Sequence, residues 1–125
     1  MADDLYAAAV AKIREYRGPD AELGHGPMAE LAPRVDRLKD ELVWGEIWND
    51  PSVDIKTRSL CTISALIVLG KEEQLANHMG WALHVGVTRE QIVSIISQMM
   101  IYGGLAGAHN AMRVAQEVFA RQDSQ

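Results

Sequence analysis

The sequence has little of what several classes of protein require. Its 125 residues include one cysteine, Cys61, so neither a disulfide nor a Cys-x-x-Cys redox pair can form within one chain. Its 12 basic residues are outnumbered by 17 acidic ones and form no run, which disfavours a nucleic-acid surface, because phosphate binding needs clustered cations. The longest apolar stretch, residues 61–70, is too short to cross a bilayer core of about 30 Å. The N-terminal segment is acidic from its start, unlike a secretory signal, and a cytoplasmic location is expected.

What remains is the composition of an ordinary globular protein, with 48% hydrophobic and 23% charged residues, and one domain over residues 1–125 is expected. Apolar residues at helical spacing, broken by glycine, proline and asparagine, predict an all-α bundle of about six helices and no strand. The predicted helices cover residues 5–16, 28–44 with a continuation to about 48, 55–69, 72–85, 89–102 and 106–121. Pro33 is expected at the start or in the first turn of the second. Thr88 and Gln91 predict a capping box.

Three ionisable residues stand out within this framework. His78 is a candidate for proton transfer, because imidazole titrates near neutral pH. Arg58 is predicted in the first turn of a helix, where the helix dipole disfavours a cation, so an anionic partner is expected. Glu46 is either that partner or shares Arg58 with a substrate. The structural alternative is an ion pair between Glu46 and Arg58, with His78 satisfying a hydrogen bond in the core.

The stretches around these residues resemble a known family. They are Gly45-Glu46-Ile47-Trp48, Lys56-Thr57-Arg58-Ser59-Leu60, His78 before the Gly-Val-Thr turn, and the segment from Tyr102 to Ala111. Over about residues 41–119 the chain resembles the carboxymuconolactone decarboxylase family of AhpD-like proteins, and residues 1–40 are expected to be a helical extension. It departs from the family pattern at Ser59, where glutamate is usual, at Ala106, where proline is usual, and at His109, where an apolar residue is more frequent.

The resemblance implies a cofactor-independent carboxy-lyase that decarboxylates a carboxylated lactone such as 4-carboxymuconolactone and delivers a proton to the resulting dienolate. His78, Arg58 and Glu46 are then the expected catalytic residues. The expected substrate-binding residues, whose aromatic members also serve packing, are Trp44, Cys61, Trp81, Tyr102 and His109. The expected partners are a small anionic lactone or keto-acid and further copies of the chain, most simply a hexamer built as a trimer of dimers. No nucleic acid, membrane, metal or cofactor is expected.

Two other functions stay open at this point. One is the thiol-dependent peroxidase or reductase activity of AhpD relatives, which use a glutamate, a Cys-x-x-Cys pair and a histidine. When the chain is aligned with these relatives at Glu46, Arg58 takes the place of their first cysteine. Cys61 takes the place of the second cysteine, and Ala65 that of the histidine. Cys61 is therefore interpreted first as a small buried core residue. The other alternative is a noncatalytic binding or assembly protein of the same fold.

Overall fold

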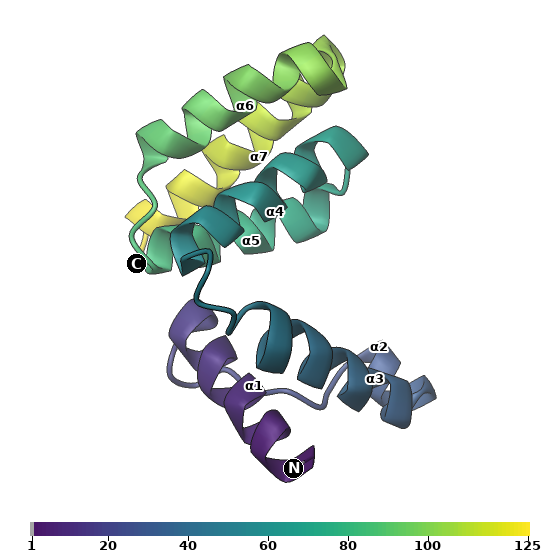
Figure 1. The fold of residues 1–125 in the computed structure, drawn as a ribbon. Coiled ribbons are helices and arrows are strands. Elements are labelled where there is room, and N and C mark those ends of the chain that lie inside the picture. The colour runs from purple at the N-terminus through teal and green to yellow at the C-terminus, as the bar shows by residue number, and fades with distance from the viewer. Residues whose placement is uncertain (1) are drawn as a thin grey trace. The chain divides into compact units, whose positions relative to one another are not determined.

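The computed structural model describes residues 2–125, with side chains from residue 4 onward, and shows helices joined by short turns (Figure 1). No strand occurs in this described range, which confirms the all-α prediction. None of its helices is long and apolar enough to cross a membrane. The chain divides into two compact units, one up to Asp54 and the other from Ile55 onward, each with its own core. The expectation of one domain over residues 1–125 stays a prediction.

The first unit contains four helical segments. They are α1 (Ala2–Arg17), α2 (Pro27–Leu31), α3 (Pro33–Asp40) and the π-helical segment η1 (Glu41–Ile47). The helix predicted over residues 5–16 is confirmed, because α1 includes it. α1 packs along η1, and α3 continues directly into η1.

The single helix predicted from residue 28 to about 48 is wrong, because the chain leaves helical geometry at Ala32 (φ −145°, ψ 66°). Proline disfavours the α-helical conformation in the residue before it, which explains the break ahead of Pro33. Pro33 itself begins α3, as expected, since its missing N–H would have no partner in a first turn. The prediction had therefore treated α2 and α3 as one continuous helix.

The packing of η1 against α1 depends on one glycine and three aromatic rings. The rings of Tyr16, Trp44 and Trp48 pack against one another at tilted angles of 34° to 42°, with centroids 4.6 to 5.8 Å apart. Trp44 and Trp48 therefore share a face of their segment, as predicted from their spacing. At Gly45 the two backbones come close, because a Cβ added there would stand 2.8 Å from the carbonyl oxygen of Leu5.

η1 ends in a turn that satisfies its own carbonyl groups. The backbone N–H of Trp48 donates to the carbonyl of Val43 at 2.9 Å, a bond across five residues that defines the π-turn. The Asn49 side-chain amide donates to the carbonyls of Trp44 and Gly45, each at 3.1 Å. The stop predicted from residue 49 onward is confirmed, since the last carbonyls of a helix need such donors.

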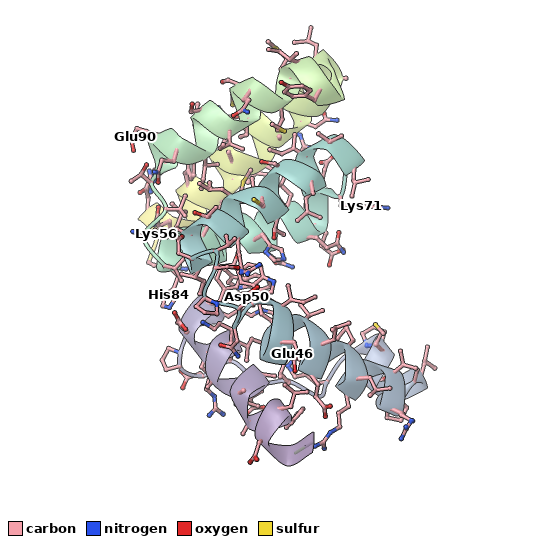
Figure 2. All side chains as sticks on the ribbon, in the orientation of Figure 1. Glu46, Asp50, Lys56, Lys71, His84 and Glu90 are labelled. Carbon is pink, nitrogen blue, oxygen red and sulfur yellow. The ribbon has the colours of Figure 1, made fainter. Side chains whose placement is uncertain are left out.

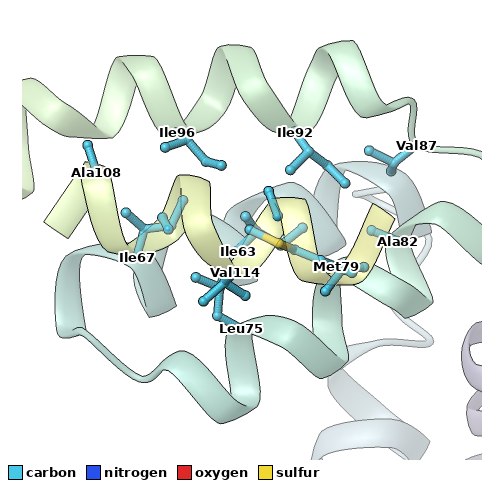
Figure 3. Close-up of a cluster of buried hydrophobic side chains, with 13 residues drawn as sticks. Ile63, Ile67, Leu75, Met79, Ala82, Val87, Ile92, Ile96, Ala108 and Val114 are labelled. Carbon is cyan, nitrogen blue, oxygen red and sulfur yellow. The ribbon is translucent and has the colours of Figure 1, made fainter. Parts of the chain in front are cut away.

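The second unit is a bundle of α4 (Ile55–Leu69), α5 (Glu72–His84), α6 (Arg89–Gly103) and α7 (Leu105–Asp123). α4 packs against α5 and α6, and α7 packs against the same two helices (Figure 1). Side chains from all four helices fill the space between them (Figure 3). The buried members of this core are Ile63, Ile67, Leu75, Met79, Ala82, Val87, Ile92, Ile96, Ala108, Ala111, Val114, Ala115 and Val118.

The turns of this bundle lie where the sequence predicted them. Gly70 and Gly86 end α4 and α5 with φ of 71° and 99°, the left-handed region that favours glycine. The capping box before α6 is present: Thr88 accepts from the N–H of Gln91 at 3.1 Å, and the Gln91 side chain accepts from the N–H of Thr88 at 2.9 Å. Glycine and capping residues thus set the helix boundaries of this unit.

Two glycines within helices provide a test of this packing. Gly45→Ala is expected to lower the free energy of unfolding by about 1–3 kcal/mol, because the new methyl group meets the Leu5 backbone. Gly80→Ala is expected to raise it by about 0.5–1 kcal/mol, since a Cβ at Gly80 meets open space and alanine favours the helix. Denaturant unfolding followed by circular dichroism measures both, and equal effects of the two changes would contradict the close approach at Gly45.

Candidate active site

The second unit supplies two of the three predicted catalytic residues. Arg58 lies in the first turn of α4 and His78 in the middle of α5, and these two helices pack against each other. Glu46 belongs to the first unit, where it lies exposed on η1. The helix positions of all three agree with the sequence analysis, and their catalytic roles stay predictions.

Arg58 is held at the edge of the bundle by the residue that follows it. Ser59 is fully buried, as is Ile63 one turn later, so this side of α4 faces the core. Arg58 lies about 100° around the helix from Ser59 and is half-buried. The Nε atom of Arg58 is buried, so part of the guanidinium is shielded from water. A cation so placed suits recognition of a carboxylate, which guanidinium binds through two parallel hydrogen bonds.

His78 is fixed in a similar way on α5. The next residue, Met79, is fully buried, and His78 itself is half-buried. Its ring meets the Trp81 ring edge to face, with centroids 4.9 Å apart and planes at 74°. The indole thus limits the rotation of an imidazole that water still reaches in part. A histidine oriented this way is suited to give or take a proton.

The pairing of α4 with α5 sets the spacing between these two residues. The Cε and Nζ atoms of Lys56 lie 3.1 Å from the point where a Cβ on Gly86 would stand. This contact places the start of α4 beside the end of α5, and Lys56 and His84 are seen at the same end of the hairpin, opposite Lys71 (Figure 2). Arg58, two residues after Lys56, therefore lies nearer this end of the hairpin than the middle of α4.

Cys61 is exposed on α4, so the interpretation of it as a buried core residue is wrong. The physical reason is the face that α4 turns inward. Ser59, Ile63 and Ile67 are buried at a spacing of four residues, and Cys61 lies about 200° around the helix from Ser59. Because most residues of this helix are apolar, the sequence did not indicate which side faces the core.

Trp81 lines a groove of about 340 Å³ between α5 and α7. Asn77, Gly80 and His84 lie along the α5 side of this groove, and Arg121 comes from α7. The sequence analysis did not select Asn77 or Arg121. The spacing of Asn77, Trp81 and His84 indicates one face of a helix, but nothing in the sequence pairs that face with Arg121.

His109 lines a second groove, of about 470 Å³, whose other residues are mainly apolar and include Val93, Met112 and Phe119. Tyr102 lies outside the core, with 71% of its surface exposed, which excludes a core role within this unit. Trp44 lies in the first unit, where it lines a cavity of about 90 Å³. The five predicted substrate-binding residues therefore do not share one pocket of the second unit.

The cavity beside Trp44 is bordered by a cluster of charged side chains on the inner side of α3. Lys39 Nζ lies 2.9 Å from an oxygen of Asp36 and 3.2 Å from one of Asp40. Burial raises the pKa of Asp40, and the nearby Asp36 charge adds to this, while Lys39 opposes it. Burial also lowers the pKa of Arg17, and Asp40 opposes that shift. For Lys39, burial acts to lower the pKa, but its hydrogen bonds with Asp36 and Asp40 raise it overall.

In the part of the chain that the structure describes, histidine, cysteine and carboxylate side chains form no group of three that could hold a metal ion. Among the residues predicted for the site, α4 and α5 supply a guanidinium, an imidazole and a thiol. These groups can bind an anion, transfer a proton and act as a nucleophile, respectively.

Comparison with known proteins gives three relatives. Over 76 residues the chain is 40% identical to 4-carboxymuconolactone decarboxylase of Acinetobacter baylyi, covering 61% of this chain and 57% of that protein. Over 100 residues it is 36% identical to an uncharacterised 15.0 kDa protein from the nqo9-nqo10 intergenic region of Paracoccus denitrificans, covering 78% and 75%. Over 80 residues it is 32% identical to the nitrosuccinic acid decarboxylase npaB of Metarhizium robertsii, covering 64% and 56%. The chain thus spans little more than half the length of the two decarboxylases.

The sequence profile of one family also matches, over residues 33–117. The match begins before residue 41, where the resemblance was expected to start, and so takes in α3 as well as η1 and α4 to α6. Glu46, Arg58 and His78 all lie inside it. Since this match covers more than half of the sequence, the chain belongs to the carboxymuconolactone decarboxylase family.

Proposed function

We propose that this protein is a cofactor-independent carboxy-lyase that decarboxylates a carboxylated lactone such as 4-carboxymuconolactone. The observation that carries the proposal is the family match over residues 33–117, which includes Arg58 and His78 on two packed helices. Two relatives that share 40% and 32% identity with the chain are decarboxylases by name. Their substrates differ, so the substrate proposed here rests on the family and on the Acinetobacter relative.

The reaction suits a site that supplies a cation and an acid. Breaking the bond between the ring carbon and its carboxylate releases carbon dioxide and leaves an electron pair on the ring. That pair is delocalised through a double bond into the lactone carbonyl, forming a dienolate. Addition of one proton gives the neutral lactone ring, so a carboxylate and a proton are converted to carbon dioxide and a C–H bond. The substrate is its own electron sink, and the protein needs only to orient it and to deliver the proton.

Within this proposal Arg58 binds an anionic group of the substrate. The half-buried guanidinium of Arg58 is less hydrated than one in open water, which strengthens its attraction for a carboxylate. His78 is the proton donor, held by its edge contact with the Trp81 ring. The role of Glu46, as the group that sets the charge or tautomer of one of these two, stays a prediction from the sequence.

We also infer that the active form is a homo-oligomer, most simply a hexamer arranged as a trimer of dimers. The chain has only 125 residues, a size at which association often adds burial. Several large apolar side chains of both units are more than half exposed within one chain. They are Leu31, Val35, Leu38, Leu42, Leu69, Ile101, Tyr102 and Leu105.

His78→Ala is expected to lower kcat for 4-carboxymuconolactone by about 10²- to 10⁴-fold, the usual contribution of a positioned general acid. The substrate is generated in place from its precursor, and its loss is followed by ultraviolet absorbance together with carbon dioxide release. His84→Ala is the matched control, since His84 is an exposed histidine on the same helix. An active His78→Ala variant would remove His78 as the acid, and an inactive wild type would reject this substrate.

Arg58→Gln is expected to lower kcat/KM by roughly 10²-fold, mainly through KM, because the charged partner of the substrate carboxylate is lost. Lys56→Gln, which removes an exposed cation two residues earlier on α4, is expected to have little effect. The unfolding midpoints of both variants show whether a change in KM comes from lost substrate binding or from lost folding stability. A normal KM together with a lowered midpoint for Arg58→Gln would show that Arg58 serves stability alone.

The exposure of Cys61 favours one second candidate, a thiol-dependent peroxidase, because a peroxide can reach the thiol. In that reaction the thiolate attacks one peroxide oxygen, becomes a sulfenic acid and is restored by an external dithiol. The chain has no resolving cysteine, so the decarboxylase remains the preferred proposal. Wild type and Cys61→Ala are expected to consume hydrogen peroxide equally slowly with dithiothreitol present, and consumption that depends on Cys61 would establish the peroxidase.

A further inference from the structure

The groove of about 340 Å³ between α5 and α7 contains a cation but none of the predicted catalytic residues. Trp81 and Arg121 are among the described residues that border it, and neither Arg58 nor His78 is. α5 packs against α4 and also against α7. His78 lies about 100° around α5 from Asn77, which lines the groove. The groove is therefore distinct from the pair formed by Arg58 and His78.

Apolar side chains form part of the wall of this groove. Val118 of α7 is buried, with 5% exposure, and Trp81 of α5 is half-buried. Gly80, next to Trp81 in the chain, also lines the groove, and a Cβ added there would meet open space. The missing side chain thus leaves room beside the indole. A flat apolar ring suits this space, because aromatic rings pack favourably on indole.

The charged side chain in the groove is positive, although the whole chain carries a net charge of −5. No aspartate or glutamate is found among the described residues that line it. The carboxylates closest to Arg121 along α7 bind other cations, since Glu117 accepts from Arg113 at 3.2 Å and Asp123 accepts from Arg89 at 2.5 Å. Arg121 therefore suits a carboxylate that comes from a ligand.

A hydrogen-bond donor lies next to this cation. The side-chain oxygen of Gln122 accepts from Nε of Arg89 at 2.9 Å and from its Nη2 at 2.6 Å. With its oxygen engaged, the amide has its NH₂ group left for a ligand, and that group only donates. A carboxylate accepts through both of its oxygens, so a guanidinium and an amide NH₂ on neighbouring residues can bind it together.

We propose that this groove binds a small flat carboxylate, namely a single aromatic ring that carries one carboxylate group. The carboxylate binds Arg121 and the NH₂ group of Gln122, and the ring lies against Trp81 and Val118. A volume of about 340 Å³ is within the range of small-molecule sites. The inference does not depend on the decarboxylation, because Arg121, Gln122 and Gly80 have no part in that reaction.

Benzoate is the probe, and its binding to the full chain is measured by saturation-transfer NMR. A Kd on the order of 1 mM is expected for so small a ligand. Benzamide has the same shape without the charge, and acetate has the same charge without the ring. Each of these two is expected to bind about tenfold more weakly or worse, because one loses the ion pair and the other loses the apolar contact.

Two variants test the groove in independent ways. Arg121→Gln removes the cation and is expected to raise the Kd for benzoate about tenfold or more. Arg113→Gln is the matched control, because it removes a cation of α7 that borders the other groove, and it is expected to change the Kd less than about twofold. Gly80→Leu fills the space beside the indole and is also expected to raise the Kd about tenfold or more. Leucine favours a helix more than glycine does, so this variant is expected to stay folded.

Circular dichroism confirms the fold of each variant, and Arg58→Gln separates the groove from the candidate active site. Benzoate binding that Arg58→Gln leaves intact and Arg121→Gln weakens is the expected result. Binding that Arg58→Gln weakens and Arg121→Gln leaves intact would place the ligand at the candidate active site and overturn the proposal. A Kd that both Arg121→Gln and Gly80→Leu leave unchanged would also overturn it, as would no binding to the wild type at about 10 mM benzoate. None of these measurements requires turnover of a lactone.

Discussion

The arrangement of the candidate site depends on the packing of α4 against α5 in the core of the second unit. Ile63 and Met79 are both fully buried in this core, and Ser59 is buried on the same face of α4 as Ile63. Arg58 directly precedes Ser59, and His78 directly precedes Met79. Because a residue's direction on a helix is fixed by that of its neighbour, burying Ser59 and Met79 also decides where Arg58 and His78 point. The half-buried state of both candidate side chains follows from this packing.

Most of the second unit could be predicted from the sequence because its helix boundaries depend on local chemistry. Glycine in the left-handed region at Gly70 and Gly86 and the capping box at Thr88 are effects that act within a few residues. The side of a helix that faces the core depends instead on contacts with other helices. The residues of α4 are apolar on most sides of the helix, so the sequence does not define which side faces inward. The contacts of α4 with α5 and α6 determine that Cys61 is exposed. The candidate acid and cation were predictable from the motifs, whereas the grooves beside Trp81 and His109 depend on α7, far away in the sequence.

The first unit was harder to predict because local and distant effects oppose each other there. The residues from Met28 to Trp48 have the apolar content of one amphipathic helix, but Pro33 forces a break at Ala32 and the chain widens into a π-turn from Glu41. On an ordinary amphipathic helix Val35 and Leu38 would face inward. Contacts between side chains of α3, α1 and η1 decide otherwise, and a pattern that counts apolar residues cannot detect a lysine shared by two carboxylates.

The cores of the two units differ in the kind of side chains that they bury. The second unit buries aliphatic side chains from four helices, whereas the first packs three tilted aromatic rings beside two buried carboxylates that share a lysine. Removing one partner of a buried carboxylate is costly because it leaves an uncompensated charge. The contacts of Lys39 with Asp36 and Asp40 therefore restrict the rotation of α3, and Val35 and Leu38 stay exposed. In this unit the polar contacts thus decide which side of α3 faces inward, although the apolar residues of the helix would favour the opposite rotation.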